Sequence, residues 1–94
     1  MGTKISGMTK PPFDVEHIPP GSRLELYISP ACPYCIRAIA HYDQLGTSYT
    51  LHDAQNDLAT RAKMFAFTGS DPTVPAIVID GTYVQSGWGK PPRG

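Results

Sequence analysis

The only two cysteines of this 94-residue chain are separated by two residues, in the sequence Cys32-Pro33-Tyr34-Cys35. A disulfide between them would close a very short loop, so it would remove little entropy from the unfolded chain and stabilise the fold little. A zinc site would need two further ligands, and the histidines have no regular ligand spacing. The favoured interpretation is therefore thiol–disulfide exchange, in which a thiolate attacks a disulfide sulfur.

The residues around the cysteine pair predict a strand before it and a helix after it. The segment 24–28 alternates and is rich in β-formers. Pro33 suits the first helical turn, because an N–H at that position would have no acceptor within the helix and its absence costs nothing. Because free N–H groups and the macrodipole at a helix N-terminus stabilise negative charge, we expect Cys32 to be the nucleophilic thiolate. Cys35, one turn into the helix, is expected to be the more buried, resolving thiol.

Capping and turn residues predict the remaining elements. The first helix should end near Leu45, before Gly46, and a second strand should span 48–52. Asn56 or Asp57 should cap a second helix that ends at Gly69. A β-branched run at 74–79 precedes Asp80-Gly81, a hairpin signal, and a last strand begins near Tyr83. This order predicts a βαβ unit with a right-handed crossover, followed by an antiparallel hairpin.

Length and charge bound the class of protein. The chain is long enough for one domain, which we place at residues 23–94, preceded by a proline-rich arm at residues 1–22. The formal net charge is zero, so no nucleic-acid partner is expected. No apolar run approaches the ~20 residues of a membrane span. The N-terminus lacks the apolar core of a secretory signal, which predicts a cytoplasmic protein.

Two motifs together resemble the glutaredoxin family. The first is Cys32-Pro33-Tyr34-Cys35, continued by Arg37-Ala38, and the second is Thr73-Val74-Pro75 before a strand and Asp80-Gly81. The resemblance covers roughly residues 23–87. It implies a thioredoxin-like α/β fold with a four-stranded mixed sheet and flanking helices. The family ends in a further helix, and residues 87–94 contain too much glycine and proline to form it.

The resemblance also implies a site. Cys32 and Cys35 would be catalytic in reversible exchange with protein disulfides or glutathione mixed disulfides. Glutathione would be a co-substrate, and no tightly bound cofactor or metal is expected. The substrate-binding residues would be Tyr34, Thr73, Val74 and Pro75, with a cis Val74–Pro75 bond. Further candidates are Arg37, Ser86, Gly87 and Trp88. Trp88 is either part of a partner surface or a cover for the core, whereas Arg61 and Lys63 are interpreted as solvated charges.

Several positions depart from the glutaredoxin pattern. Ser29 stands where the family usually has Lys or Arg, and Gln85-Ser86-Gly87 replaces a Gly-Gly pair followed by an acidic residue. Both departures weaken the case for glutathione as a partner. Ser86-Gly87-Trp88 with Pro91 is similar to redoxins that serve ribonucleotide reductase and accept electrons from thioredoxin reductase. A third alternative is an iron–sulfur-binding glutaredoxin, although the rigid ring of Pro33 would crowd a bridging cluster.

The missing helix raises the question of what covers the sheet. The strand at 76–79 is apolar on both faces, so both faces need a cover. The unassigned apolar residues lie mostly in the arm: Ile5, Met8, Phe13, Val15 and Ile18. We therefore predict that the arm from about Phe13 to Ile18 folds back on the sheet or pairs with a neighbouring chain. The rival hypothesis is a disordered arm and a sheet covered by a dimer partner.

Overall fold

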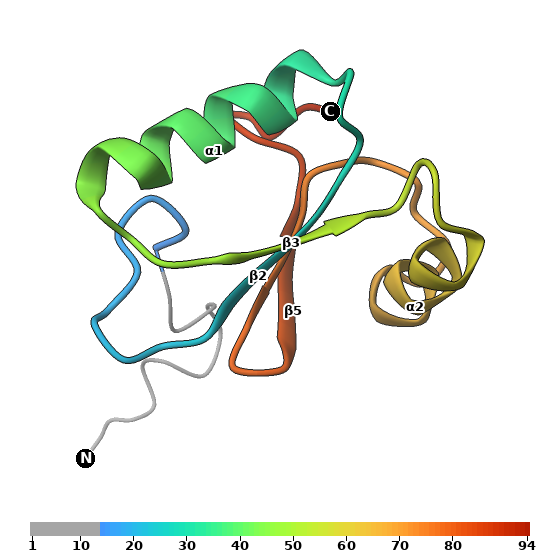
Figure 1. Ribbon diagram of the computed structural model, residues 1–94, viewed down its shortest axis with the longest axis horizontal. Coiled ribbons are helices and arrows are strands. Elements are labelled where there is room, and N and C mark those ends of the chain that lie inside the picture. The colour runs from blue at the N-terminus through green and yellow to red at the C-terminus, as the bar shows by residue number, and fades with distance from the viewer. Residues whose placement is uncertain (1–13) are drawn as a thin grey trace.

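Local capping signals set the helices of the computed structural model, which describes residues 14–94. Pro33 begins α1, and Gly46, at φ 72°, ends it with its N–H directed at the Asp43 carbonyl. The Asp57 carboxylate accepts the amides of Ala59 and Thr60 at the start of α2, and Gly69 ends that helix. The elements, shown in Figure 1, are β2 (Leu24–Ile28), α1 (Pro33–Leu45), β3 (Thr50–Asp53), α2 (Leu58–Thr68), β4 (Ala76–Ile79) and β5 (Thr82–Ser86).

The four strands form one mixed sheet in the order β3-β2-β4-β5. β2 and β3 run parallel on either side of the α1 crossover, whereas β4 is antiparallel to both β2 and β5. The β4–β5 turn has positive φ at Asp80 and Gly81, as a tight hairpin turn requires. Residues 87–94 form no helix. The predicted thioredoxin-like sheet without a terminal helix is therefore confirmed.

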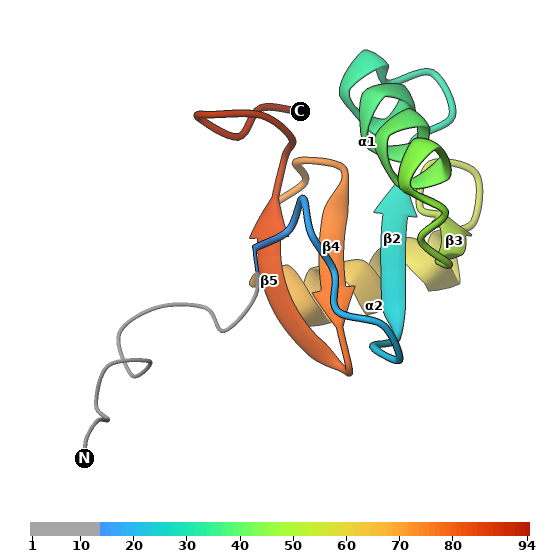
Figure 2. The ribbon, with the colours of Figure 1, turned by 90° about the vertical axis from the view of Figure 1, so that its left-hand side faces the viewer.

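The pleat of the central strands divides the core between two faces. Leu24, Leu26 and Ile28 of β2 pack with the inner side of α1, and Tyr27 packs on the opposite face with Met64 of α2. All four residues of β4 are buried. Figure 2 shows the two helices on opposite sides of the sheet. Neither helix is long and apolar enough to cross a membrane.

Part of the N-terminal arm covers the α1 face beside the helix. Val15 and Ile18 pack against the core cluster of that face, so the predicted fold-back is confirmed for these two residues. The Tyr42 hydroxyl donates to the Val15 carbonyl, and the ring nitrogen Nε2 of His41 lies 2.7 Å from the Glu16 carbonyl. Ile5, Met8 and Phe13 lie outside the described residues, and the division of the chain at residue 22 stays a prediction.

We expect Ile18→Ala to lower the free energy of unfolding by roughly 1–2 kcal/mol. A fully buried Ile→Ala change costs about 2–5 kcal/mol, and Ile18 is only partly buried. Leu58→Ala is the control, because Leu58 is 75% exposed and should change the free energy by less than about 0.5 kcal/mol. Urea unfolding followed by circular dichroism measures both values. Equal effects of the two substitutions would mean that residue 18 covers nothing.

Candidate active site

Cys32 lies in the short connection between β2 and α1, directly before the first residue of the helix. It occupies the N-cap position with extended backbone, φ −81° and ψ 121°. Its N–H donates to the Ser29 carbonyl at 3.1 Å, and its own carbonyl accepts the Ile36 amide at 3.1 Å. The amides of the first turn have no acceptor within the helix, and that turn carries no acidic residue. The half-buried Cys32 thiol therefore lies at a helix end that favours negative charge.

Cys35 lies one turn further on, on the buried side of α1. Its side chain is 1% exposed and belongs to the core cluster. Burial raises the pKa of the Cys35 thiol, and a hydrogen bond with Cys32 acts in the same direction. Both cysteines are free thiols in this structure. The pair therefore combines a reachable sulfur with a protonated one held behind it.

The loop before β4 lies against the Cys32 thiol. The Val74–Pro75 peptide bond is cis, as the resemblance implied. The Cys32 thiol donates to the Val74 carbonyl over 3.9 Å. The Asp71 carboxylate accepts the Thr73 amide at 2.9 Å, and the Pro75 carbonyl accepts the Gly87 amide at 2.8 Å. These bonds fix the three predicted loop residues beside the sulfur.

Tyr34 and Arg37 lie on the outer side of the first turns of α1. The Arg37 guanidinium is 5.3 Å from the centre of the Tyr34 ring, within the range of a cation–π contact. Arg37 is exposed and Tyr34 is half-buried. Their predicted roles in binding stay predictions; Tyr34 lies two residues and Arg37 five residues after Cys32 along the chain.

The polar side chains at the end of β5 form hydrogen bonds within their own segment. The Ser86 hydroxyl bonds to the Tyr83 hydroxyl at 2.6 Å, and the Gln85 amide donates to the Gly87 carbonyl at 3.0 Å. The Trp88 ring packs 5.5 Å from Tyr42 and 5.3 Å from His41, measured between ring centres. Of the two interpretations of Trp88, the structure therefore favours the cover for the core.

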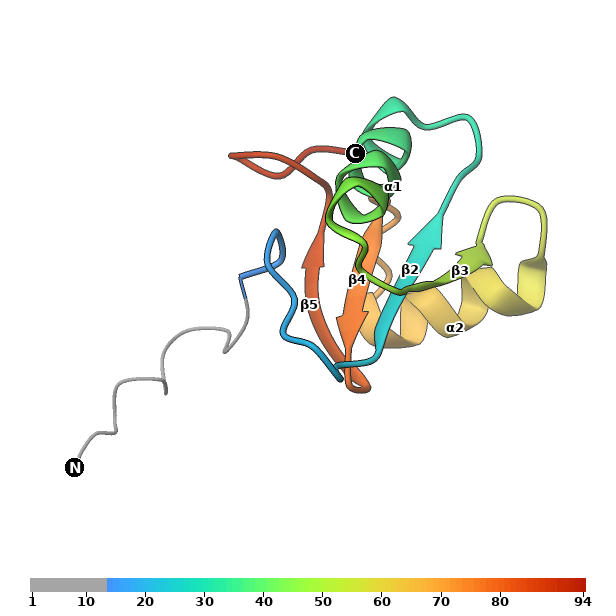
Figure 3. The same cartoon turned by 60° about the vertical axis from the view of Figure 1, so that its left-hand side comes forward.

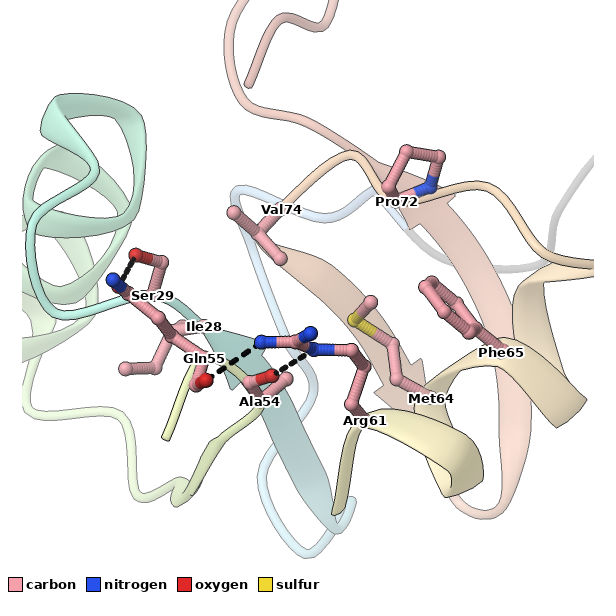
Figure 4. A pocket seen from close by; sticks show the side chains of 9 residues that line it. All are labelled: Ile28, Ser29, Ala54, Gln55, Arg61, Met64, Phe65, Pro72 and Val74. Carbon is pink, nitrogen blue, oxygen red and sulfur yellow. Dashed lines mark hydrogen bonds between the residues drawn. The ribbon is translucent and has the colours of Figure 1, made fainter. Parts of the chain in front are cut away.

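A cavity of about 250 Å³ adjoins the loop at Val74 and was not anticipated from the sequence. Figure 4 shows the guanidinium of Arg61 across its floor, donating to the carbonyls of Ala54 at 2.8 Å and Gln55 at 2.6 Å. The interpretation of Arg61 as a solvated charge is therefore wrong. Its acceptors are backbone carbonyls of the β3–α2 loop. The sequence could not predict this contact, because no local sequence pattern shows which loop carbonyls will face a side chain. The Ser29 hydroxyl, also in the cavity wall, donates to the Gln55 side chain.

Within residues 14–94, no group of three or more His, Cys, Asp or Glu side chains is arranged to hold a metal ion. The candidate site consists of the half-buried Cys32 sulfur at a helix end, the buried Cys35 sulfur behind it and a carbonyl of the Thr73–Pro75 loop in front.

Comparisons with known proteins agree with this arrangement. The sequence model of the glutaredoxin family matches residues 24–84. Among solved structures, the crystal structure of glutaredoxin 1 from Francisella tularensis complexed with cacodylate is similar, with a TM-score of 0.55. The two chains share 24% sequence identity, and the match covers 69% of this chain and 83% of that chain. At this level of identity, the similarity to the solved structure is a similarity of fold. None of the curated proteins matches the sequence.

The geometry predicts that iodoacetamide at neutral pH alkylates Cys32 well before Cys35. Cys35 is buried and its raised pKa leaves little thiolate at pH 7, so its alkylation should accelerate only as the pH rises. Peptide mapping by mass spectrometry after timed quenching gives both rates. Faster labelling of Cys35 would contradict the assignment of Cys32 as the accessible thiol.

Proposed function

The chain belongs to the glutaredoxin family, and we propose that it is a dithiol–disulfide oxidoreductase in which Cys32 attacks and Cys35 resolves. One observation carries the proposal: the half-buried Cys32 thiol at the α1 N-terminus, with buried Cys35 behind it and the Val74 carbonyl 3.9 Å in front. A helix N-terminus supports a thiolate, and the loop carbonyl offers a hydrogen-bond acceptor to a substrate backbone.

The proposed reaction proceeds in two exchanges. The Cys32 thiolate attacks one sulfur of a substrate disulfide, so a bond forms between Cys32 and that sulfur while the other substrate sulfur leaves as a thiolate. The Cys35 thiol then loses its proton and attacks the Cys32 sulfur, which releases the second substrate thiolate. Two electrons pass from the dithiol to the substrate, and the protein is left with a Cys32–Cys35 disulfide.

Protein disulfides are the substrates we favour over glutathione mixed disulfides. Ser29 donates its hydroxyl to Gln55 and offers no positive charge to a carboxylate. The segment 85–90 contains no acidic residue that could pair with an ammonium group. Glutathione therefore remains a weaker co-substrate in this proposal, held by the loop at Val74 with few charged contacts. The absence of a tightly bound cofactor and a cytoplasmic location stay predictions.

A second candidate is a redoxin that takes electrons from thioredoxin reductase and passes them to an enzyme such as ribonucleotide reductase. The specific observation is the turn after β5, where Gly87 adopts φ 91° and Trp88 packs on α1. This is the segment Ser86-Gly87-Trp88, which resembles those redoxins. The two candidates share the dithiol chemistry and differ in the electron donor.

We expect Cys32→Ser to abolish exchange with every disulfide, because no other thiol is within reach of solvent in the described residues. Cys35→Ser should lose reduction of protein disulfides but keep turnover of a glutathione mixed disulfide, since free glutathione can replace the resolving thiol. Insulin reduction and the turnover of a glutathionylated peptide measure the two activities. Retained insulin reduction in Cys35→Ser would contradict the dithiol mechanism.

The electron donor is tested by reducing the oxidised protein with glutathione and glutathione reductase, or with thioredoxin and its reductase. We expect the second system to be faster. Ser29→Lys should raise the glutathione rate about fivefold, because one exposed charge pair contributes up to about 1 kcal/mol. Ser29→Gln is the control that lacks the charge. Fast reduction of the unmodified protein by glutathione, unaltered by Ser29→Lys, would refute the ranking of donors.

A further inference from the structure

The segment that follows β5 folds into a tight hairpin, here called the flap (residues 88–94). Trp88 and Arg93 pair as an antiparallel bridge, with N–H···O distances of 2.7 and 3.0 Å. Gly87 permits this closure because it has no side chain. A Cβ at Gly87 would lie 2.8 Å from the Arg93 nitrogen, and its φ of 91° is unfavourable for other residues.

The flap is held at its base by contacts with three parts of the domain. The Trp88 ring packs against Tyr42 of α1, and the Gly87 amide donates to the Pro75 carbonyl at 2.8 Å. The Lys90 ammonium lies 3.9 Å from the Glu16 carboxylate of the arm. Figure 3 shows the flap reaching from the end of β5 back toward α1. These contacts fix the direction in which its last residues run.

The last residue of the flap lies on the loop that faces the reactive sulfur. A Cβ at Gly94 would overlap the Val74 carbonyl oxygen and would lie 2.6 Å from Cγ2 of Thr73. The same carbonyl oxygen is 3.9 Å from the Cys32 sulfur. Figures 1 and 2 accordingly show the C-terminal end beside the N-terminal end of α1. An extended peptide joined to Cys32 and pairing with Val74 therefore meets the backbone of Gly94.

We propose that the flap is a specificity element that covers the Val74 edge: a protein disulfide whose peptide pairs along that edge reacts only after the flap opens, whereas a compact disulfide reacts whether it is open or closed. This inference rests on the proposed function. A compact disulfide needs only the Cys32 sulfur, whereas a peptide that pairs along Val74 must displace residues 93–94. When only a fraction of the protein molecules is in the state that can bind a ligand, the apparent affinity for that ligand is reduced by the same fraction. The flap thus lowers reactivity with glutathionylated peptides relative to compact disulfides.

Glycine substitutions open the flap without touching the thiols. Gly94→Ala places a methyl group on the Val74 carbonyl, and Gly87→Ala places one against the Arg93 backbone. Gly69→Ala, at the end of α2, is the control for backbone strain: its φ of 71° is also unfavourable for alanine, but it lies outside the flap and its Cβ would meet nothing within 4 Å. Trp88 is the only tryptophan, so its emission reports on the flap, and hydrogen exchange of the Arg93 amide reports on the bridge.

The experiment measures single-turnover oxidation of the reduced full chain by a glutathionylated peptide and by hydroxyethyl disulfide, with no free glutathione. We expect the rate constant for the peptide, divided by that for hydroxyethyl disulfide, to rise about tenfold in Gly94→Ala and in Gly87→Ala. This is the change expected if the flap is open in about one-tenth of the unmodified molecules. The ratio in Gly69→Ala should stay near that of the unmodified protein. Arg93 exchange should accelerate in the first two variants.

Two results would overturn the inference. One is an unchanged ratio in both variants although Arg93 exchange shows an open flap. The other is unchanged Arg93 exchange in both, which would mean that Gly94 does not lie on Val74. If the unmodified protein and all variants oxidise with neither disulfide, the proposed function fails as well, and that outcome is distinct because hydroxyethyl disulfide does not depend on the flap.

Discussion

The antiparallel register of β2 and β4 is the constraint on which the site depends. Tyr27 pairs with Ala76, so the end of β2 and the start of β4 lie side by side at one edge of the sheet. The chain that leaves β2 reaches Cys32, and the chain that enters β4 passes through Val74. A slip of β2 by one residue would turn Leu26 away from the α1 core and Tyr27 toward it. Core packing therefore fixes the distance between sulfur and loop carbonyl.

The two cysteine side chains differ in how deeply they are buried. Cys35 is a member of the hydrophobic core and the proposed resolving thiol, and its apolar surroundings raise its pKa. Cys32 differs in lying at the N-terminal end of α1, half-buried at the margin of the core. The depth of each sulfur thus supports the proposed order of the two exchange steps.

Two segments at opposite ends of the chain together occupy the α1 face of the sheet. Val15 and Ile18 come from the arm, Trp88 comes from the flap, and the Glu16–Lys90 ion pair joins the two segments. An exposed pair of this kind contributes little energy, so the apolar contacts of Trp88 carry most of the attachment. Because the flap that contributes to this cover also ends at Val74, covering the core and restricting the substrate edge become parts of one arrangement.

The sequence by itself determined the helices and strands and pointed to the cysteine pair proposed to react. Pro33, Gly46, Asp57 and the Asp80-Gly81 turn act through bonds and φ angles within a few residues, so their effects can be predicted locally. Only the tertiary structure decided the partners of Arg61, the docking of Val15 and the position of Gly94 on the Val74 carbonyl. Each of these depends on which free carbonyl or apolar surface the packed sheet presents, and residues distant in sequence set that surface.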